Sequence, residues 1–267
     1  FPTYFARHPR KVAWLIHQHR AAYELCGTEY SDFEHVDLDV GLRQKLMELD
    51  RQMLEECERR YTIAKTTTRR LERFNGVRAD PLYHPPRLAE RLRAGPYGDY
   101  VLSVGRLESI KRIDLLLKAM PAVDPSLRLL VAGEGTQREH FEAVAEECGL
   151  NGRVEFMGRV DDETLLELYA GALAVAFVPY DEDYGLVTLE AFLARKPVVT
   201  ASDSGGTLEF VDDGLTGIVC APEADAVADA LNRLVANRKL AASLGDAGYE
   251  RARVITWDTV IEKLVEA

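Results

Sequence analysis

The sequence has few cysteines and no long apolar run. Its 267 residues include four cysteines, at positions 26, 57, 148 and 220, and none of them belongs to a C-x-x-C pair. This spacing argues against a zinc site or a disulfide framework and predicts four buried free thiols in a reducing cytoplasm. The longest uncharged apolar run, residues 170–179, is far shorter than the ~20 residues that a membrane span needs.

The chain also lacks an excess of positive charge. Lysine and arginine number 33 against 44 aspartates and glutamates, which gives a net charge of −11. This balance disfavours nonspecific binding to nucleic acid or to an anionic membrane and leaves room only for a local basic pocket. No signal-peptide pattern is present. We therefore expect a cytoplasmic protein, with peripheral attachment to the inner membrane as the alternative.

The rest of the composition is that of an ordinary globular protein. Hydrophobic residues make up 47% and charged residues 29% of the chain, which excludes a disordered, collagenous or fibrous protein. At roughly 150 residues per domain, the length corresponds to about 1.8 domains.

The first part of the chain predicts a small α/β arrangement. Residues 12–16 form an apolar run that ends at His17, so we expect a buried strand with a histidine at its carboxyl end. Helical spacing of apolar residues predicts a helix over 41–60. A strand over 61–64 and a helix over 67–74 follow, and Asn75-Gly76 should end that helix. Proline- and glycine-rich sequence places a linker at 84–98.

From residue 99, apolar strands alternate with helices. This order predicts a doubly wound parallel sheet, whose ligands bind beyond the carboxyl ends of the strands. The expected strands are 100–104, 127–132, 154–156, 174–178 and 197–200, and the expected helices are 112–120, 137–148, 164–170 and 186–194.

The first two of these strand-end loops carry glycines and cations. Gly105 lets a ligand approach the backbone closely, and Arg106 and Lys111 follow it. An anion between the two cations is one interpretation, and solvated surface charge is the other. The next loop reads G-E-G-T-Q-R from Gly133. Because Arg138 stands where a dinucleotide fingerprint has its third glycine, NAD binding ranks last among the interpretations.

The loop before residue 186 is the most informative. Acidic residues precede a helix that begins at about Gly185, and the simplest interpretation is N-terminal capping. Glu190 lies one turn into this helix among apolar neighbours, where a carboxylate is costly unless it is paired. A ligand or an internal partner would satisfy it. In the following loop, Gly205-Gly206 opens a helix and is either an anion cradle or a simple turn.

These motifs, in this order, resemble those of GT-B glycosyltransferases, most closely glycosyltransferase family 4 (group 1). The resemblance covers about residues 60–267. It consists of Gly-Arg with a lysine five residues on (Arg106, Lys111), two glutamates in the context E-x-x-G-L-x-x-x-E-A (Glu182, Glu190), and P-V-V followed by G-G-x-x-E. It implies one complete Rossmann-like donor-binding domain of α/β class, with a truncated Rossmann-like acceptor-side domain before it.

The resemblance also implies roles for individual residues. Arg106 and Lys111 would bind the donor diphosphate, Glu182 the sugar hydroxyls and Glu190 the ribose. His17, with His19 as the fallback, would face the donor sugar. The implied catalytic residues are Glu182, Arg106, Lys111 and His17, and the implied donor-binding residues are Gly105, Gly133, Glu134, Gly135, Arg159, Val160, Asp183, Tyr184, Gly185, Leu186, Val187, Glu190, Gly205 and Gly206.

The implied reaction is a retaining, metal-independent transfer from a nucleoside-diphosphate sugar to a glycan, lipid or small-molecule acceptor. Fixed cations and a helix N-terminus would stabilise the departing diphosphate. We expect no further cofactor, no metal and no nucleic-acid partner. Two alternatives stay open: an inactive donor-binding fragment of such an enzyme, and a nucleotide-sugar epimerase of the same architecture.

The chain departs from the family pattern at three places. Asp183 replaces a glycine, Arg195-Lys196 stands where a glycine precedes P-V-V and suggests a surface change, and residues 83–86 replace Asn-Gly at the domain junction. We expect an acceptor-side part and linker over 1–90, a donor domain over 91–250, and a helix over 251–267 that crosses back to the first domain. Phe1 would then mark a boundary inside a fold.

Overall fold

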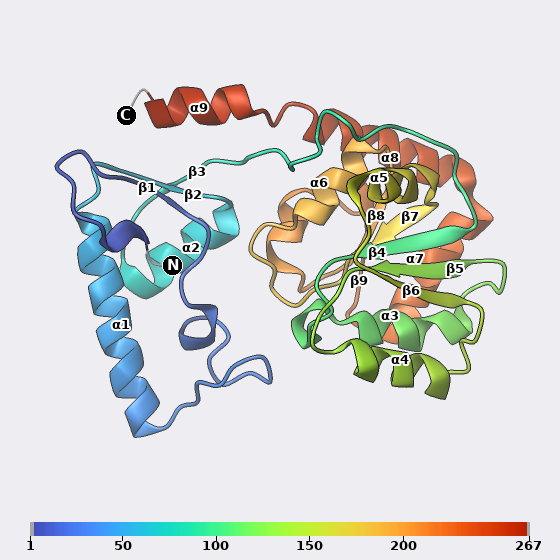
Figure 1. Ribbon diagram of the computed structural model, residues 1–267, viewed down its shortest axis with the longest axis horizontal. Helices are drawn as coiled ribbons and strands as arrows, with labels where there is room; N and C mark the ends of the chain where they lie inside the picture. The colour runs from blue at the N-terminus through green and yellow to red at the C-terminus, as the bar shows by residue number, and fades with distance from the viewer. Residues whose placement is uncertain (1–2, 266–267) are drawn as a thin grey trace. The chain divides into compact units, whose positions relative to one another are not determined.

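The computed structural model describes residues 3–265 and divides the chain into two compact units. The first unit comprises the residues up to His84 together with those from Thr256 onward, and the second unit comprises Pro85–Ile255. Each unit has a parallel sheet of its own (Figure 1). The start of the chain at Phe1 and the last two residues of the helix expected at the C-terminus lie outside the described residues.

The second unit is built on a parallel sheet in the order β6-β5-β4-β7-β8-β9, called here the six-stranded sheet, within the described residues. Its middle strands are buried along almost their whole length, as apolar runs predict for a sheet covered on both faces. The strands are β4 (Tyr100–Val104), β5 (Arg128–Ala132), β6 (Val154–Gly158), β7 (Ala174–Ala176), β8 (Val198–Ala201) and β9 (Gly217–Cys220).

Helices cover both faces of this sheet. Figure 1 shows α3, α4 and α7 on one face and α5, α6 and α8 on the other, and α3 packs against both α4 and α7. The helices are α3 (Ile113–Ala119), α4 (Arg138–Glu147), α5 (Asp162–Gly171), α6 (Leu186–Leu193), α7 (Ala224–Ala236) and α8 (Arg238–Ala252), with 3-10 turns η3 (Ser109–Lys111), η4 (Met120–Ala122) and η5 (Gly205–Glu209). This is the doubly wound arrangement that the sequence predicts.

The first unit has a parallel sheet in the order β1-β2-β3 within the described residues. The buried face of its last helix, α9, contributes Val260, which packs with Tyr61 of this sheet and with Leu82, the residue directly after its third strand. The Tyr61 hydroxyl also donates to the Lys263 carbonyl oxygen (3.2 Å). The elements are η1 (Thr3–Phe5), β1 (Val12–Leu15), η2 (Arg20–Ala22), α1 (Asp37–Glu55), β2 (Arg59–Thr62), α2 (Lys65–Asn75), β3 (Asp80–Pro81) and α9 (Trp257–Val265).

The long helix of the first unit lies earlier in the sequence than predicted. Asp37 and Asp39 occupy the first turn of α1, where the helix dipole favours acids. The predicted end at residue 60 is wrong, because Arg59 already pairs with Val12 in the sheet. The stop at Gly76 is confirmed, since this glycine caps α2 in the left-handed conformation.

Two burial predictions need correction. The cysteines are free thiols, but only Cys57 is buried, and Cys26, Cys148 and Cys220 are half-buried. Lys196, interpreted as a surface change, is fully buried. Its ammonium donates to the carbonyl oxygens of Gly95 and Pro96, both at 2.9 Å.

Candidate functional site

The order of the six-stranded sheet places a candidate site at one edge. β4 lies in the middle of the sheet and pairs with β5 on one side and β7 on the other. The chain first adds strands on the β5 side and then crosses over to add strands on the β7 side, so the strand order reverses at β4. A crevice forms at such a switch point, outside the carboxyl ends of the strands. The loops that follow β4 and β7, together with the first half of α6, carry most of the residues that the sequence analysis selects. We call the edge formed by the ends of these strands the carboxyl edge.

The loop after β4 presents an open backbone and two cations. Gly105 has a φ of 150°, which favours glycine, and a Cβ placed there would meet open space. Arg106 is exposed and forms no ion pair with the residues that the structure describes. Lys111, in η3, is largely covered, with 14% of its side chain exposed. Gly105, Arg106 and Lys111 thus all lie in the segment between β4 and α3.

The glycines after β5 serve loop packing. A Cβ on Gly133 would lie 1.8 Å from the Gly105 carbonyl oxygen, and one on Gly135 would lie 2.3 Å from the Leu107 carbonyl oxygen. The Leu107 N–H donates to the Glu134 carbonyl oxygen (2.9 Å), and the Gly133 N–H donates to the Gly158 carbonyl oxygen (2.8 Å). The loops after β4 and β5 and the last residue of β6 are thus joined by their backbones, and the first two loops lie at a spacing that only glycine allows.

The loop after β7 brings a carboxylate to Lys111. Glu182 accepts a hydrogen bond from the Lys111 ammonium, and 15% of the Glu182 side chain is exposed. Gly185 then takes the left-handed conformation before α6, and no side chain caps this helix. The first N–H groups of a helix have no acceptor within the helix. The positive end of α6 therefore starts three residues after Glu182.

Glu190 has an internal partner, and its helix is not buried all round as the sequence suggested. The Tyr169 hydroxyl on α5 donates to the Glu190 carboxylate at 2.6 Å. Burial raises the pKa of Glu190, and the Tyr169 hydrogen bond opposes that rise. Leu186, Val187 and Glu190 are only half-buried, and their i, i+3 and i+4 spacing places them on one face. One turn of α6 thus offers this carboxylate together with the helix N-terminus.

The loop after β8 packs against the loop after β7. A Cβ on Gly206 would lie 2.3 Å from the Asp183 carbonyl oxygen, and the Gly206 N–H donates to the Glu182 carbonyl oxygen (2.6 Å). This N–H is therefore committed to the protein and is not offered to an anion. Gly205 has a φ of 57° and approaches the same loop, with a would-be Cβ 2.5 Å from the Glu182 carbonyl oxygen. Close backbone approach explains this glycine pair.

The remaining predicted residues are scattered. Asp183 and Tyr184 are buried, and the Tyr184 ring packs edge-on against Phe210. Arg159 is exposed and Val160 half-buried. His17 lies two residues after β1 in the first unit, with its Nδ1 close to the Gln18 carbonyl oxygen. The contact residues that the sequence analysis missed are Arg112, Asp203 and Tyr169, which pair with one another or with site residues.

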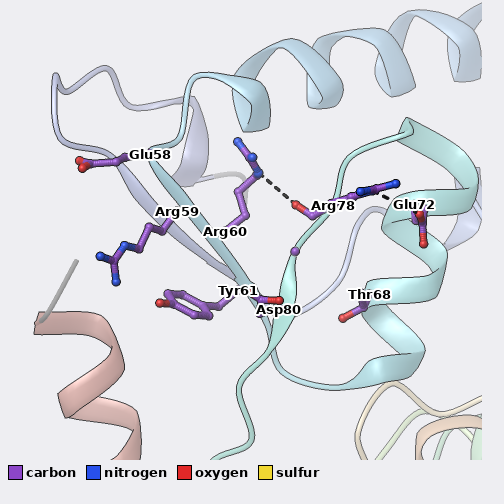
Figure 2. A pocket seen from close by; sticks show the side chains of 9 residues that line it. Glu58, Arg59, Arg60, Tyr61, Thr68, Glu72, Arg78 and Asp80 are labelled. Carbon is purple, nitrogen blue, oxygen red and sulfur yellow. Dashed lines mark hydrogen bonds and ion pairs between the residues drawn. The ribbon is translucent and has the colours of Figure 1, made fainter.

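A separate cavity of about 430 Å³ lies in the first unit, and none of the residues that line it is among the predicted site residues. Figure 2 shows that its charges have mixed sign: Glu58, Arg59, Arg60, Glu72, Arg78 and Asp80. Arg60 donates to the carbonyl oxygens of Leu54, Cys57 and Arg78. Because the lining carries both acidic and basic side chains, and the Arg60 guanidinium already donates to backbone carbonyl oxygens, the cavity does not favour a ligand of either charge.

The carboxyl edge of the six-stranded sheet has the features of an anion site. Arg106 and Lys111 follow β4, Lys111 is paired with Glu182 in the loop after β7, and the N-terminus of α6 comes directly after that loop. Preorganised positive groups of this kind stabilise negative charge that develops on a leaving group. In the described part of the chain, no group of three or more His, Cys, Asp and Glu could hold a metal ion. No described helix is long and apolar enough to cross a membrane.

Comparison with known proteins adds a family match. Residues 90–251 match the family model for glycosyl transferases group 1. The chain is 32% identical over 251 residues to a D-inositol 3-phosphate glycosyltransferase of Nocardia farcinica, covering 88% of this chain and 55% of that protein. It is 39% identical over 140 residues to a glycogen synthase of Mycobacterium tuberculosis, covering 51% and 33%. The chain spans about half the length, or less, of these curated relatives.

Solved structures agree with the fold. The Anabaena protein HepE in complex with UDP-glucose matches with a TM-score of 0.78 at 19% identity, over 96% of this chain and 71% of that one. A sucrose-phosphate synthase from Thermosynechococcus elongatus matches with a TM-score of 0.70 at 26% identity, over 84% and 60%. The predicted GT-B type fold, with two parallel-sheet units, is confirmed by these matches.

Proposed function

Because this chain belongs to the group 1 glycosyl transferases, we propose that it binds a nucleoside-diphosphate sugar at the carboxyl edge of the six-stranded sheet and takes part in transferring the sugar to an acceptor. The observation that carries this proposal is the Lys111–Glu182 pair. A cation suited to a diphosphate and a carboxylate suited to sugar hydroxyls meet there, three residues before the uncapped N-terminus of α6.

Charge development explains why such a site suits sugar transfer. Breaking the bond between the sugar and the phosphate leaves negative charge on the diphosphate and positive charge on the anomeric carbon. Lys111, Arg106 and the positive end of α6 would stabilise the departing diphosphate, because they are already in place before the bond breaks. Glu182 would accept hydrogen bonds from the sugar, and Glu190 would accept them from the ribose.

We propose further that the reaction retains the anomeric configuration and needs no metal ion. The fixed cations can supply the positive charge that a divalent ion supplies elsewhere. Sugar transfer should therefore proceed at the same rate after treatment with EDTA, and NMR of the first product should show the anomer of the donor. Loss of activity on chelation, or an inverted product, would refute the respective statement.

Nucleotide binding is the direct test. Isothermal titration with UDP, GDP and ADP should show binding of at least one, and Lys111→Ala should weaken it about thirtyfold, as expected for loss of a charged hydrogen-bonding group. Lys118→Ala is the matched control, since Lys118 pairs with Asp114 on the exposed side of α3. Absence of binding, or equal effects of the two substitutions, would overturn the proposed function.

The length of the relatives bears on what this chain does alone. It covers 55% of the Nocardia relative, so we propose donor binding for this chain and sugar transfer for the whole protein. A panel of nucleotide sugars, analysed by mass spectrometry and NMR, separates the outcomes. Released free sugar indicates an active donor site, and an epimerised nucleotide sugar would favour an epimerase instead. Binding without any turnover indicates an inactive donor-binding fragment.

A further inference from the structure

Arg112 stands in a backbone conformation that side chains rarely adopt. It separates η3 from α3 with φ 51° and ψ 44°, in the left-handed region. Among the described residues, Asp181 and Arg195 are the other non-glycine positions with positive φ. Such a conformation is strained for a residue with a side chain and persists when surrounding contacts enforce it. The contacts of the Arg112 side chain are therefore informative.

The Arg112 guanidinium joins three loops. Its Nε donates to the Val178 carbonyl oxygen (2.8 Å) and its Nη2 to the Pro179 carbonyl oxygen (3.0 Å). Its two terminal nitrogens also bind the Asp203 carboxylate in a bidentate pair, at 2.6 and 2.8 Å. Only 12% of the Arg112 side chain is exposed. The loops after β4, β7 and β8 thus share one charged group.

Backbone hydrogen bonds extend this junction to the proposed donor site. The Asp181 N–H donates to the Asp203 carbonyl oxygen (2.9 Å), and the Glu182 carbonyl oxygen accepts from the Gly206 N–H (2.6 Å). The Glu182 side chain contacts Lys111, which immediately precedes Arg112. The backbone N–H of Asp181 and the backbone carbonyl of Glu182 are therefore both bonded to the segment 203–206.

We propose that Arg112 and Asp203 are positioning residues that hold the loop of Glu182 against Lys111, and so set how well the site distinguishes a nucleotide sugar from the bare diphosphate. This inference rests on the proposed function. Neither residue needs to touch the donor. If the ion pair is removed, the loop after β7 is free to shift, and Glu182 loses its fixed place for the sugar while Lys111 and Arg106 still attract the diphosphate.

Arg112→Gly tests the proposal, because glycine accepts the left-handed conformation and only the guanidinium is lost. We expect the ratio of the dissociation constants, Kd of UDP-glucose over Kd of UDP, to rise about fivefold or more by titration calorimetry. A protein that is merely less folded binds fewer equivalents of both ligands and keeps this ratio. Arg112→Lys should restore the ratio only in part, because lysine lacks the planar fork that binds a carboxylate in bidentate fashion.

Arg195→Gly is the matched control. Arg195 also has a positive φ (55°), also pairs with an aspartate (Asp246, 2.6 Å) and lies over the Tyr249 ring (4.0 Å), but it precedes β8 and lies at the opposite edge of the sheet. We expect a lowered thermal midpoint with an unchanged ratio. Asp203→Asn keeps the shape of the pair without its charge, and it carries the same test if Arg112→Gly does not fold.

The outcomes are separable. An unchanged ratio in both Arg112→Gly and Asp203→Asn, while the wild type binds UDP and UDP-glucose, would overturn the positioning role and leave the proposed function intact. An equal change in Arg195→Gly would also overturn it, because the effect would then follow from general stability. A wild-type chain that binds neither of these ligands, nor GDP and ADP, would overturn the proposed function and this inference with it.

Discussion

At the carboxyl edge of the six-stranded sheet, Lys111 is paired with the side chain of Glu182, whereas at the opposite, amino edge Lys196 donates to the carbonyl oxygens of Gly95 and Pro96. A ligand can take the place of a side-chain partner, because side chains rotate. Backbone carbonyl oxygens that are fixed in the segment before β4 cannot be replaced in this way. Lys111 can therefore exchange its partner, as the proposed function requires, whereas Lys196 is committed to structure.

The arginines repeat this contrast. Both Arg112 and Arg195 adopt positive φ and pair with an aspartate. Arg112 joins loops that carry proposed ligand-binding groups, whereas Arg195 contacts α8 through Asp246 and Tyr249. An arginine–aspartate pair thus joins loops of the proposed site at the carboxyl edge and packs against a helix at the amino edge. The edge on which a residue lies, rather than its type, indicates its role in this sheet.

The largest expected effect concerns backbone packing at the two edges. Gly133→Ala places a Cβ 1.8 Å from the Gly105 carbonyl oxygen at a φ of 145°, so we expect a loss of about 4 kcal/mol in the free energy of unfolding of the second unit. Gly152→Ala, in the turn before β6, has a φ of 77° with no atom within 4 Å of the new Cβ, and should cost about 1 kcal/mol.

Urea unfolding followed by circular dichroism measures both variants. The two tryptophans, Trp14 and Trp257, lie in the first unit, so their fluorescence serves as an internal control and should keep the wild-type transition. Equal losses in Gly133→Ala and Gly152→Ala would show that the loops at the carboxyl edge are not tightly joined, and the contrast between the edges would fail at this point.

The second prediction concerns the pH dependence that Lys196 contributes. Burial lowers the pKa of Lys196 from 10.5 to about 8. Between these two pH values the unfolded chain binds more protons than the folded chain, so the stability contributed by Lys196 rises with pH in that window and is constant below it. The full rise corresponds to about 3 kcal/mol.

Comparison with Lys196→Met isolates this contribution. The free energy of unfolding of the wild type, minus that of the variant, should increase as the pH rises from about 8 to 10.5. The stability that Lys118 contributes should instead fall as the pH rises through its titration, because its hydrogen bond with Asp114 raises the pKa of Lys118. If the difference in the free energy of unfolding between the wild type and Lys196→Met does not change with pH, the Lys196 ammonium is in contact with water. The contrast between Lys196 and Lys111 would then be wrong.

The sequence predicts strands β4 to β8 of the second unit well and the buried charges of this unit poorly. Apolar runs between helices are a local signal, so β4 is predicted residue for residue and its neighbours within a few residues. Lys196 has no such signal, since its partners Gly95 and Pro96 lie about a hundred residues earlier. A charged residue beside another charged residue is indistinguishable in sequence from a surface pair.

The candidate site shows the same limit. Lys111 stands out through its spacing from Arg106, but Arg112 differs from a solvated cation only through its left-handed backbone and its pairing with Asp203, 91 residues later. The sequence analysis also assigns no element where β9, α7 and α8 lie. In α8, alanine and glycine, such as Ala241 and Gly245, fill most of the buried positions, so the apolar periodicity of that helix is weak.

The smallest expected effect concerns the hydroxyl groups of two tyrosines in the second unit. Each donates a hydrogen bond to a residue of a helix, Tyr169 to one in α6 and Tyr100 to one in α5. The Tyr169 hydroxyl donates to Glu190 near the carboxyl edge, whereas the Tyr100 hydroxyl donates to the Leu168 carbonyl oxygen from the first residue of β4 (2.8 Å). The hydrogen bond from Tyr169 lowers the pKa of Glu190 against the effect of burial. Tyr169→Phe should therefore raise that pKa further.

If Glu190 binds ribose hydroxyls as a carboxylate, its protonation weakens nucleotide binding. UDP affinity, measured by calorimetry from about pH 5 to pH 8, should then begin to fall at a higher pH in Tyr169→Phe than in the wild type, with a loss of about threefold in the acid range. Tyr100→Phe should keep the wild-type profile, because its hydroxyl contacts backbone at the amino edge. Identical profiles for all three proteins would show that the Glu190 carboxylate does not contribute to nucleotide binding, and equal shifts in both variants would show that packing of α5, rather than the Tyr169–Glu190 hydrogen bond, controls the affinity.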